Sequence, residues 1–214
     1  MNRVIITRPE HDTSTRYLSR WSENIIKIAE QKGFEVFDLH KEKAIRQELE
    51  GRIKKTSPEL VILNGHGDSE SVGGHDNYIL IKVGENEKIL KNRITYAISC
   101  KSAKVLGKAC ADKKTAYIGY NEDFIFNGQS KYLQKPLKDK RAAQFLDAAN
   151  QVTIALLKGH TAKEASDISK DAFKKALKKI LPSTTSDPYA REDVRDLFWN
   201  MNHQVCLGNE NAKI

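Results

Sequence analysis

The sequence predicts an α/β fold in which a mostly parallel sheet lies between two layers of helices. Three observations favour this fold. Short apolar segments recur along the first half of the chain, helix-like segments separate them, and the apolar segments show no polar alternation. Strands that are apolar on both faces need helices on both sides of the sheet. We therefore expect a three-layer αβα sandwich, with helical additions toward the C-terminus.

The predicted elements follow one another as alternating strands and helices. In the first helix, Tyr17, Trp21 and Ile25 share an apolar stripe, and Gly33 supplies its C-terminal glycine. A turn-like Gly84–Asn86 segment after an apolar run predicts one arm of a small hairpin at 78–83. The predicted strands are 4–7, 34–37, 60–63, 94–98, 116–120 and 203–207. The predicted helices are 14–32, 41–55, 102–111, 141–158, 162–180 and 191–201.

Length and composition indicate one folded domain. The chain has 214 residues, of which 39% are hydrophobic and 30% charged, and this composition excludes a disordered protein. We expect a single domain over 1–214, with a core at 1–125, an exposed basic loop at 129–141, and a helical region with a final strand at 141–208. No segment approaches the ~20 apolar residues of a membrane helix, and the N-terminus lacks the apolar core of a signal peptide. A cytoplasmic protein without a membrane partner is expected.

The positive charge is concentrated in one part of the chain. The net charge is +8, and residues 101–180 hold 17 Lys and Arg against 8 Asp and Glu. The Lys-rich run 170–179 is typical of the solvated face of an amphipathic helix. No recognised nucleic-acid-binding motif accompanies it, so a nucleic-acid partner is not expected.

Three cysteines are too few and too scattered for a disulfide framework. Cys110 lies in a helix-like segment and Cys206 in an apolar run, so both are interpreted as core residues. Cys100 differs, because it comes directly after the predicted strand 94–98.

Two predicted strands end in residues that could act together. His66 follows strand 60–63 and Cys100 follows strand 94–98. Neighbouring strands lie ~4.8 Å apart, and carboxyl ends of parallel strands share one edge, so an imidazole could serve the thiol there. A helix starting just after Cys100 would lower the thiol pKa. The backbone amides of Gly67 and Cys100 could stabilise an oxyanion, whereas no third residue that would orient His66 is evident.

An apolar strand, His-Gly, a spacer and a second apolar strand ending in Cys resembles the caspase-like cysteine peptidases. The resemblance covers the chain from Val4 to about Tyr120. It implies a caspase-like fold, a catalytic dyad of His66 and Cys100, and an oxyanion amide from Gly67. The substrate would be a peptide or protein, and no cofactor would be needed.

The departures from the caspases favour another branch of that group. The caspase segment Gln-Ala-Cys-Arg-Gly is absent, and 34 residues separate His66 from Cys100 where caspases have about 50. The chain resembles the gingipain-, clostripain- or CHAT-like members more closely. In clostripain-like relatives an acidic residue after the next strand lines the S1 pocket, which implies that Asp123 or Glu122 selects a basic P1 residue. The Lys-rich loop 131–141 would then offer sites for self-processing.

Two alternatives stay open at this point. Residues 65–76 contain two histidines and three carboxylates, a set that could form the metal site of a metal-dependent hydrolase, although its spacing matches no known motif and no metal ligand is assigned. The other alternative is a catalytically silent adaptor on the same fold, acting through its basic helical face.

Overall fold

A six-stranded sheet forms the centre of the protein, which a computed structural model describes over residues 2–214. The strand order is β2-β1-β3-β6-β7-β8. Every neighbouring pair is parallel except β7 and β8, which are antiparallel. The strands are β1 (Arg3–Arg8), β2 (Glu35–His40), β3 (Leu60–Asn64), β6 (Ile94–Ile98), β7 (Ala116–Tyr120) and β8 (Gln204–Gly208). The predicted mostly parallel α/β fold is confirmed.

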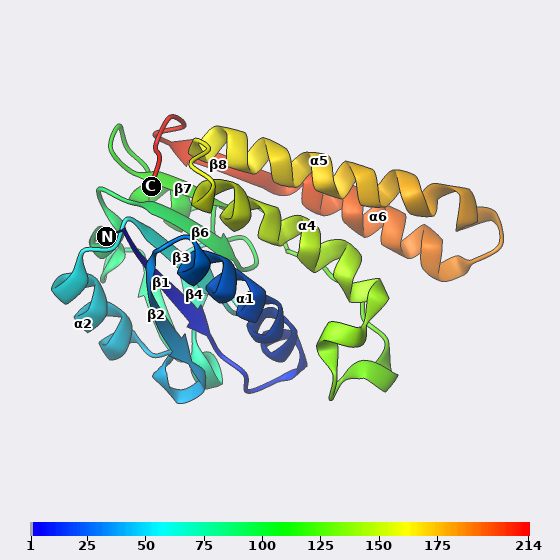
Figure 1. The fold of residues 1–214 in the computed structure, drawn as a ribbon, viewed down its shortest axis with the longest axis horizontal. Coiled ribbons are helices and arrows are strands. Elements are labelled where there is room, and N and C mark those ends of the chain that lie inside the picture. The colour runs from blue at the N-terminus through cyan, green and yellow to red at the C-terminus, as the bar shows by residue number, and fades with distance from the viewer. Residues whose placement is uncertain (1) are drawn as a thin grey trace.

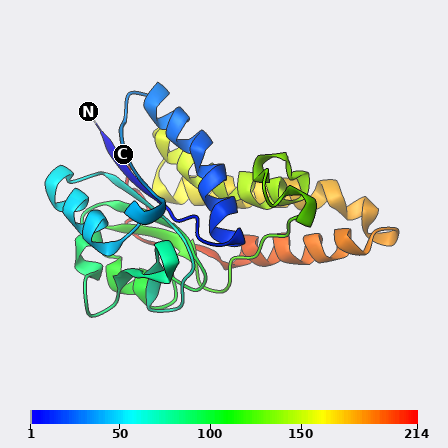
Figure 2. The same ribbon diagram turned by 90° about the horizontal axis from the view of Figure 1, so that it is seen from below.

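Helices cover both faces of this sheet (Figures 1 and 2). The side chains of each strand alternate between the two faces. In β1, for example, Val4 and Ile6 belong to one hydrophobic cluster and Ile5 to the other. The first face packs against α1 (Thr13–Gln31), α4 (Lys140–Leu157) and α5 (Ala162–Ile180). The second packs against α2 (Arg46–Thr56), α3 (Leu106–Cys110) and the hairpin of β4 (Ser71–Gly73) and β5 (Ile79–Lys82).

The C-terminal helices extend past the sheet. In Figures 1 and 2 the helices α4, α5 and α6 (Pro188–His203) run beyond the strands as a helical arm. Strand β8 follows α6 directly and returns the chain to the sheet edge beside β7. The helical additions predicted for this region are confirmed, and Lys174, Lys175 and Lys178 are exposed on α5 as expected.

Two predicted helices begin later than expected. The segment 41–55, predicted as one helix, forms a 3-10 turn at Lys41–Lys43 and then α2 from Arg46, because the chain is extended at Ile45. The helix predicted over 102–111 is shortened to α3, five residues from Leu106 to Cys110. Backbone amides of the preceding turn donate to other loops instead, at the carbonyls of Ser69 and Tyr120. Those contacts compete with the helical hydrogen bonds that the sequence predicts.

The basic segment 129–141 is exposed but held in place. It contains two short 3-10 turns, Ser130–Tyr132 and Pro136–Lys138, rather than irregular chain alone. The carboxylate of Asp139 is fully buried, caps α4, and accepts a hydrogen bond from the Tyr17 hydroxyl at 2.8 Å. Asp139 thereby fixes the end of this segment against α1.

The other local predictions have mixed outcomes. Cys110 is a buried core residue as predicted. Cys206 is only half-buried, because edge strand β8 packs its side chain partly against the core. Over residues 2–214, no helix has both the length and the apolar character needed to cross a membrane.

Candidate functional site

Four consecutive strands of the sheet end at the same edge. Strands β1, β3, β6 and β7 are neighbours in this order and run parallel. The loops that follow them carry Asp12, His66, Cys100 and Asp123, one on each loop. Two carboxylates, an imidazole and a thiol therefore lie at the carboxyl-terminal edge of the sheet, on four segments that are far apart in sequence. Functional residues of parallel sheets lie at this edge.

The loop after β3 presents His66 to solvent. Gly65 has a φ of 155°, and a Cβ there would lie 2.1 Å from the carbonyl oxygen of Gly73, so only glycine fits. The amide of Gly73 donates to the carbonyl of His66 at 2.8 Å, which closes the loop behind the imidazole. The His66 side chain remains 45% exposed.

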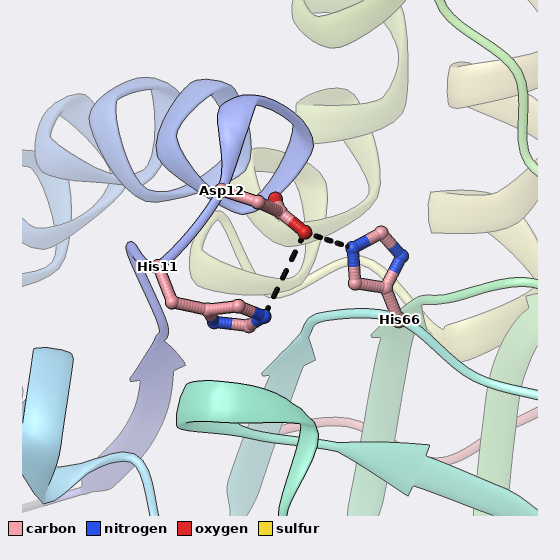
Figure 3. Close-up of side chains that lie close together, drawn as sticks. All are labelled: His11, Asp12 and His66. Carbon is pink, nitrogen blue, oxygen red and sulfur yellow. Dashed lines mark hydrogen bonds and ion pairs between the residues drawn. The ribbon is translucent and has the colours of Figure 1, made fainter.

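The imidazole of His66 has a carboxylate partner, Asp12. Its Nε2 atom lies 2.5 Å from Asp12 Oδ2 (Figure 3). Asp12 is also the N-cap of α1, where it accepts a hydrogen bond from the Thr15 amide at 2.8 Å. Burial raises the pKa of the Asp12 carboxyl, but the bonds from Thr15 and His66 outweigh it and hold that pKa below its usual value. Asp12 is thus an ionised group that can orient His66.

Asp12 was not identified from the sequence as a partner of His66, although its position after an apolar strand indicates a site residue. Asp12 follows the apolar strand β1, as His66 follows β3. The two are 54 residues apart, and only the pairing of β1 with β3 brings them together.

The loop after β6 touches the His66 loop closely. A Cβ on Gly67 would lie 2.0 Å from Ser99 Oγ and 3.2 Å from the Cys100 carbonyl oxygen. Ser99, which is buried, donates its hydroxyl to the His66 carbonyl at 3.1 Å. The two loops are therefore in contact at Gly67, as the sequence predicts for neighbouring strand ends. No hydrogen bond joins the His66 and Cys100 side chains among residues 2–214.

The Cys100 thiol lies in a recessed, partly buried position. Its Sγ atom is 3.8 Å from the carbonyl oxygen of Phe124, to which it donates a weak hydrogen bond. Burial raises the pKa of the Cys100 thiol, and the Asp123 carboxylate adds to the rise, while the charge of Lys101 opposes it. The expectation of a pKa lowered by a following helix is wrong. Helix α3 begins only at Leu106, so its amides are too far along the chain to act on the sulfur.

Two backbone amides of these contacting loops donate no hydrogen bond. Among the hydrogen bonds of residues 2–214, neither the Gly67 nor the Cys100 amide is a donor. Lys101, the residue after the thiol, has a φ of 55°, an uncommon conformation for a residue other than glycine. Its own amide donates to the Glu122 carbonyl at 3.0 Å, which anchors the turn on the loop after β7.

Both acidic residues after β7 already have lysine partners. Lys101 Nζ lies 3.1 Å from Asp123 Oδ2, and Lys104 Nζ lies 2.9 Å from Glu122 Oε1. The hydrogen bond from Lys104 lowers the pKa of Glu122. Of these two acids, Asp123 is the one whose carboxylate raises the pKa of the Cys100 thiol.

A cluster of imidazoles surrounds Asp12. His11 Nε2 lies 3.6 Å from Asp12 Oδ2, and the His11 ring centre lies 6.1 Å from that of His66 (Figure 3). The His11 ring centre also lies 5.6 Å from that of His75. The nearest ligand atoms of His11, Asp12 and His66 all lie within 4.8 Å of one another, and the same holds for His11, His75 and Asp76. The loop 65–76 does not supply a complete set of metal ligands by itself, because both of these sets include His11 from the loop after β1.

Comparison with known proteins supports the fold. No protein-family model and no curated protein matches the chain. The crystal structure of the Arg-specific cysteine proteinase gingipain R matches with a TM-score of 0.65 and 12% identity, over 100% of this chain and 47% of that chain. A complex of the Porphyromonas gingivalis RgpB pro- and mature domains matches with a TM-score of 0.62 and 11% identity, over 98% of this chain and 47% of that chain. This chain thus spans about half the length of those proteinase chains. At such low identity the likeness concerns the fold alone, and this chain has the caspase-like α/β fold of the gingipain structures.

Proposed function

We propose that this protein is a cysteine peptidase in which His66 and Cys100 form the catalytic dyad. One observation carries the proposal: a carboxylate, an imidazole, a thiol and a second carboxylate follow one another on the loops of β1, β3, β6 and β7. This order matches the roles of orienting group, base, nucleophile and substrate-recognition group. The fold that this chain shares with two cysteine proteinase structures adds support.

The hydrogen bonding of His66 suggests how a proton would move. Asp12 engages Nε2, so Nδ1 is the nitrogen left to take the proton of the Cys100 thiol. The resulting thiolate attacks the carbonyl carbon of a peptide bond, and the unused amides of Gly67 and Cys100 donate to the oxyanion. Protonated His66 then gives its proton to the leaving amine, and water hydrolyses the thioester.

Because the thiol pKa is raised, we place the proton transfer from Cys100 to His66 in the same step as the attack on the substrate. Burial disfavours a resting thiolate, so Cys100 would stay protonated until a substrate and His66 are in place. A basic P1 side chain that pairs with Asp123 would also offset the effect of that carboxylate on the thiol. To bind there, it must displace Lys101 from an exposed ion pair, and exposed ion pairs are weak. Recognition of Arg or Lys and activation of Cys100 are thus linked through Asp123.

A panel of fluorogenic peptides that differ only at P1 tests the proposal. We expect cleavage after Arg and Lys, no cleavage after Asp, and no turnover by Cys100→Ala. Asp123→Asn should reduce cleavage after Arg, whereas Glu122→Gln, a matched loss of charge paired with another lysine, should have a smaller effect. Cleavage after Asp alone would contradict the role of Asp123. Absence of any Cys100-dependent cleavage would favour a catalytically silent protein on this fold.

Self-processing of the basic segment follows from the same preference. Lys131, Lys135 and Lys138 are exposed in the segment 129–141. If Asp123 selects basic residues, the purified wild-type protein should be cut in this segment over time and Cys100→Ala should not. Equal stability of the two proteins on a denaturing gel would contradict self-processing while leaving peptide cleavage untouched.

A further inference from the structure

We infer that His11, Asp12 and His66 form a site for one Zn²⁺ ion and that zinc bound there inhibits the peptidase. The binding step depends only on the arrangement of the three side chains (Figure 3). The inhibition step rests on the proposed function, because it uses the role of His66 as base.

The charges around Asp12 favour a cation. Among residues 2–214, the ion-pair partners of Asp12 are two imidazoles, His11 and His66, and neither a lysine nor an arginine. A neutral imidazole contributes no charge to balance the carboxylate. Divalent zinc would balance it and would bind the nitrogen and oxygen donors that are already gathered there.

His11 itself lacks a complete set of hydrogen bonds. Its side chain is only 10% exposed, and its Nδ1 atom is buried without a partner. Its Nε2 atom faces Asp12 at 3.6 Å and Asn77 Oδ1 at 3.3 Å. The proposed peptidase mechanism assigns no role to His11. In a metal site its Nε2 atom, which faces Asp12, would be a ligand.

The spacing of the donor atoms suits a tetrahedral ion. Zinc–nitrogen bonds of ~2.0–2.1 Å place neighbouring ligand atoms ~3.3 Å apart in a tetrahedron. The corresponding separations here are 2.5 Å from His66 to Asp12 and 3.6 Å from His11 to Asp12. His66 and Asp12 are both partly exposed, so small side-chain rotations can bring the three ligands to that spacing. Three protein ligands would leave a fourth position for water.

The second group of ligand atoms, His11, His75 and Asp76, is less suitable. The side chain of Asp76 is 62% exposed, against 39% for that of Asp12. By contrast, Asp12 and His66 already contact each other directly. We therefore place the ion at Asp12.

Zinc at this position would stop proton transfer from Cys100. With its Nε2 atom bound to the ion, the His66 ring carries its single proton on Nδ1. Nδ1 then has no lone pair with which to accept the proton of the thiol. The thiol would stay protonated and would not attack the substrate.

Metal binding can be measured without any activity. We propose titrating the chelator-treated full chain with Co²⁺, followed by its visible d–d absorption, and then displacing Co²⁺ with Zn²⁺. Wild type and Asp76→Asn should bind one equivalent with similar affinity, and Asp12→Asn and His11→Gln should bind about 100-fold more weakly. Asparagine caps helices as well as aspartate, so Asp12→Asn should keep α1 intact.

Inhibition is then measured on peptide cleavage. Zn²⁺ should inhibit the wild type, a chelator should restore activity, and His11→Gln should keep the basal rate while resisting zinc. Failure of the wild type to bind Co²⁺ would refute the metal site. If Asp76→Asn loses affinity for Co²⁺ and Asp12→Asn keeps it, the ion does not bind at Asp12. Zinc binding that leaves cleavage unaffected would overturn inhibition. A protein that binds metal as expected but cleaves no peptide would refute the peptidase and leave the metal site standing.

Discussion

The loops after β3 and β6 place the side chains of His66 and Cys100 in opposite environments. His66 is nearly half exposed and contacts an ionised carboxylate. Cys100 is partly buried, and its thiol pKa is raised. The imidazole thus has a carboxylate partner, whereas burial favours the neutral form of the thiol.

This difference shows that a cysteine at a strand end does not gain a lowered thiol pKa from that position itself. The turn after β6 continues for several residues before α3 begins, so no helix N-terminus acts on the sulfur. In the proposed mechanism the reactivity of Cys100 comes from His66 on one neighbouring loop, whereas Asp123 on the other opposes ionisation of the thiol. The following predictions test that division of roles, from the largest expected effect to the smallest.

Removal of either member of the dyad should have the largest effect. We expect Cys100→Ala to lower kcat/KM for a cleaved peptide by about 10³-fold or more, and His66→Ala by about 10²- to 10⁴-fold. Purified variants and a continuous fluorogenic assay give both values. Substantial activity in His66→Ala would mean that another group takes the proton of Cys100.

The contact between the two loops should tolerate no side chain at Gly67. Gly67→Ala would place a Cβ 2.0 Å from Ser99 Oγ, and such overpacking typically costs about 1–3 kcal/mol of unfolding free energy. Gly51→Ala is the control, since Gly51 lies within α2 with open space around it. It should stabilise the protein by about 0.5–1 kcal/mol. Denaturant unfolding measures both, and a neutral Gly67→Ala would mean that the loops are less closely packed.

Loss of the Asp12 carboxylate should impair catalysis without unfolding the protein. We expect Asp12→Asn to lower kcat by about 10- to 100-fold with little change in KM, because an asparagine neither balances nor orients a protonated His66 as a carboxylate does. The melting temperature should fall only modestly at neutral pH, since asparagine also caps α1 but the stabilising contribution of the ionised carboxylate is lost. Unchanged kcat would show that Asp12 serves only as a helix cap.

The stability of the protein at acidic pH should depend on the Asp12 carboxylate. The pKa of Asp12 is lower in the folded protein than its ordinary value, so its contribution to stability is present above that ordinary value and is lost as pH falls through the folded pKa. Denaturant unfolding at a series of pH values should therefore show a smaller acid-induced loss in Asp12→Asn than in wild type. An identical pH dependence in the two proteins would argue against an ionised Asp12.

The smallest effect concerns the thiol itself. Removing the Asp123 carboxylate should lower the pKa of Cys100 and so raise its rate of alkylation by iodoacetamide at neutral pH, by about two- to fivefold. Glu122→Gln should change that rate less, since the carboxylate of Glu122 pairs with Lys104 and is not among the main causes of the raised thiol pKa. Mass spectrometry of the labelled peptides separates Cys100 from Cys110 and Cys206. In both of these, burial raises the thiol pKa to about 12. Equal rates in the two variants would contradict an effect of Asp123 on Cys100.

The sequence by itself determined the fold class and the places of His66 and Cys100. Apolar runs such as Leu60–Leu63 and Ile94–Ile98 are typical of strands buried on both faces, because they are short and lack polar alternation, and the local sequence is enough to predict them. Once both runs are parallel neighbours, the residues that follow them meet at one edge.

The tertiary structure alone decided the partners and environment of those residues. The role of Asp12 depends on the pairing of β1 with β3, and the burial of the thiol depends on the turn before α3 and on the loop after β7. Contacts of this kind join segments that are tens of residues apart, and no periodicity records them. A residue's position at a strand end is a local property of the sequence, whereas the pKa of its side chain is set by neighbours that only folding brings together.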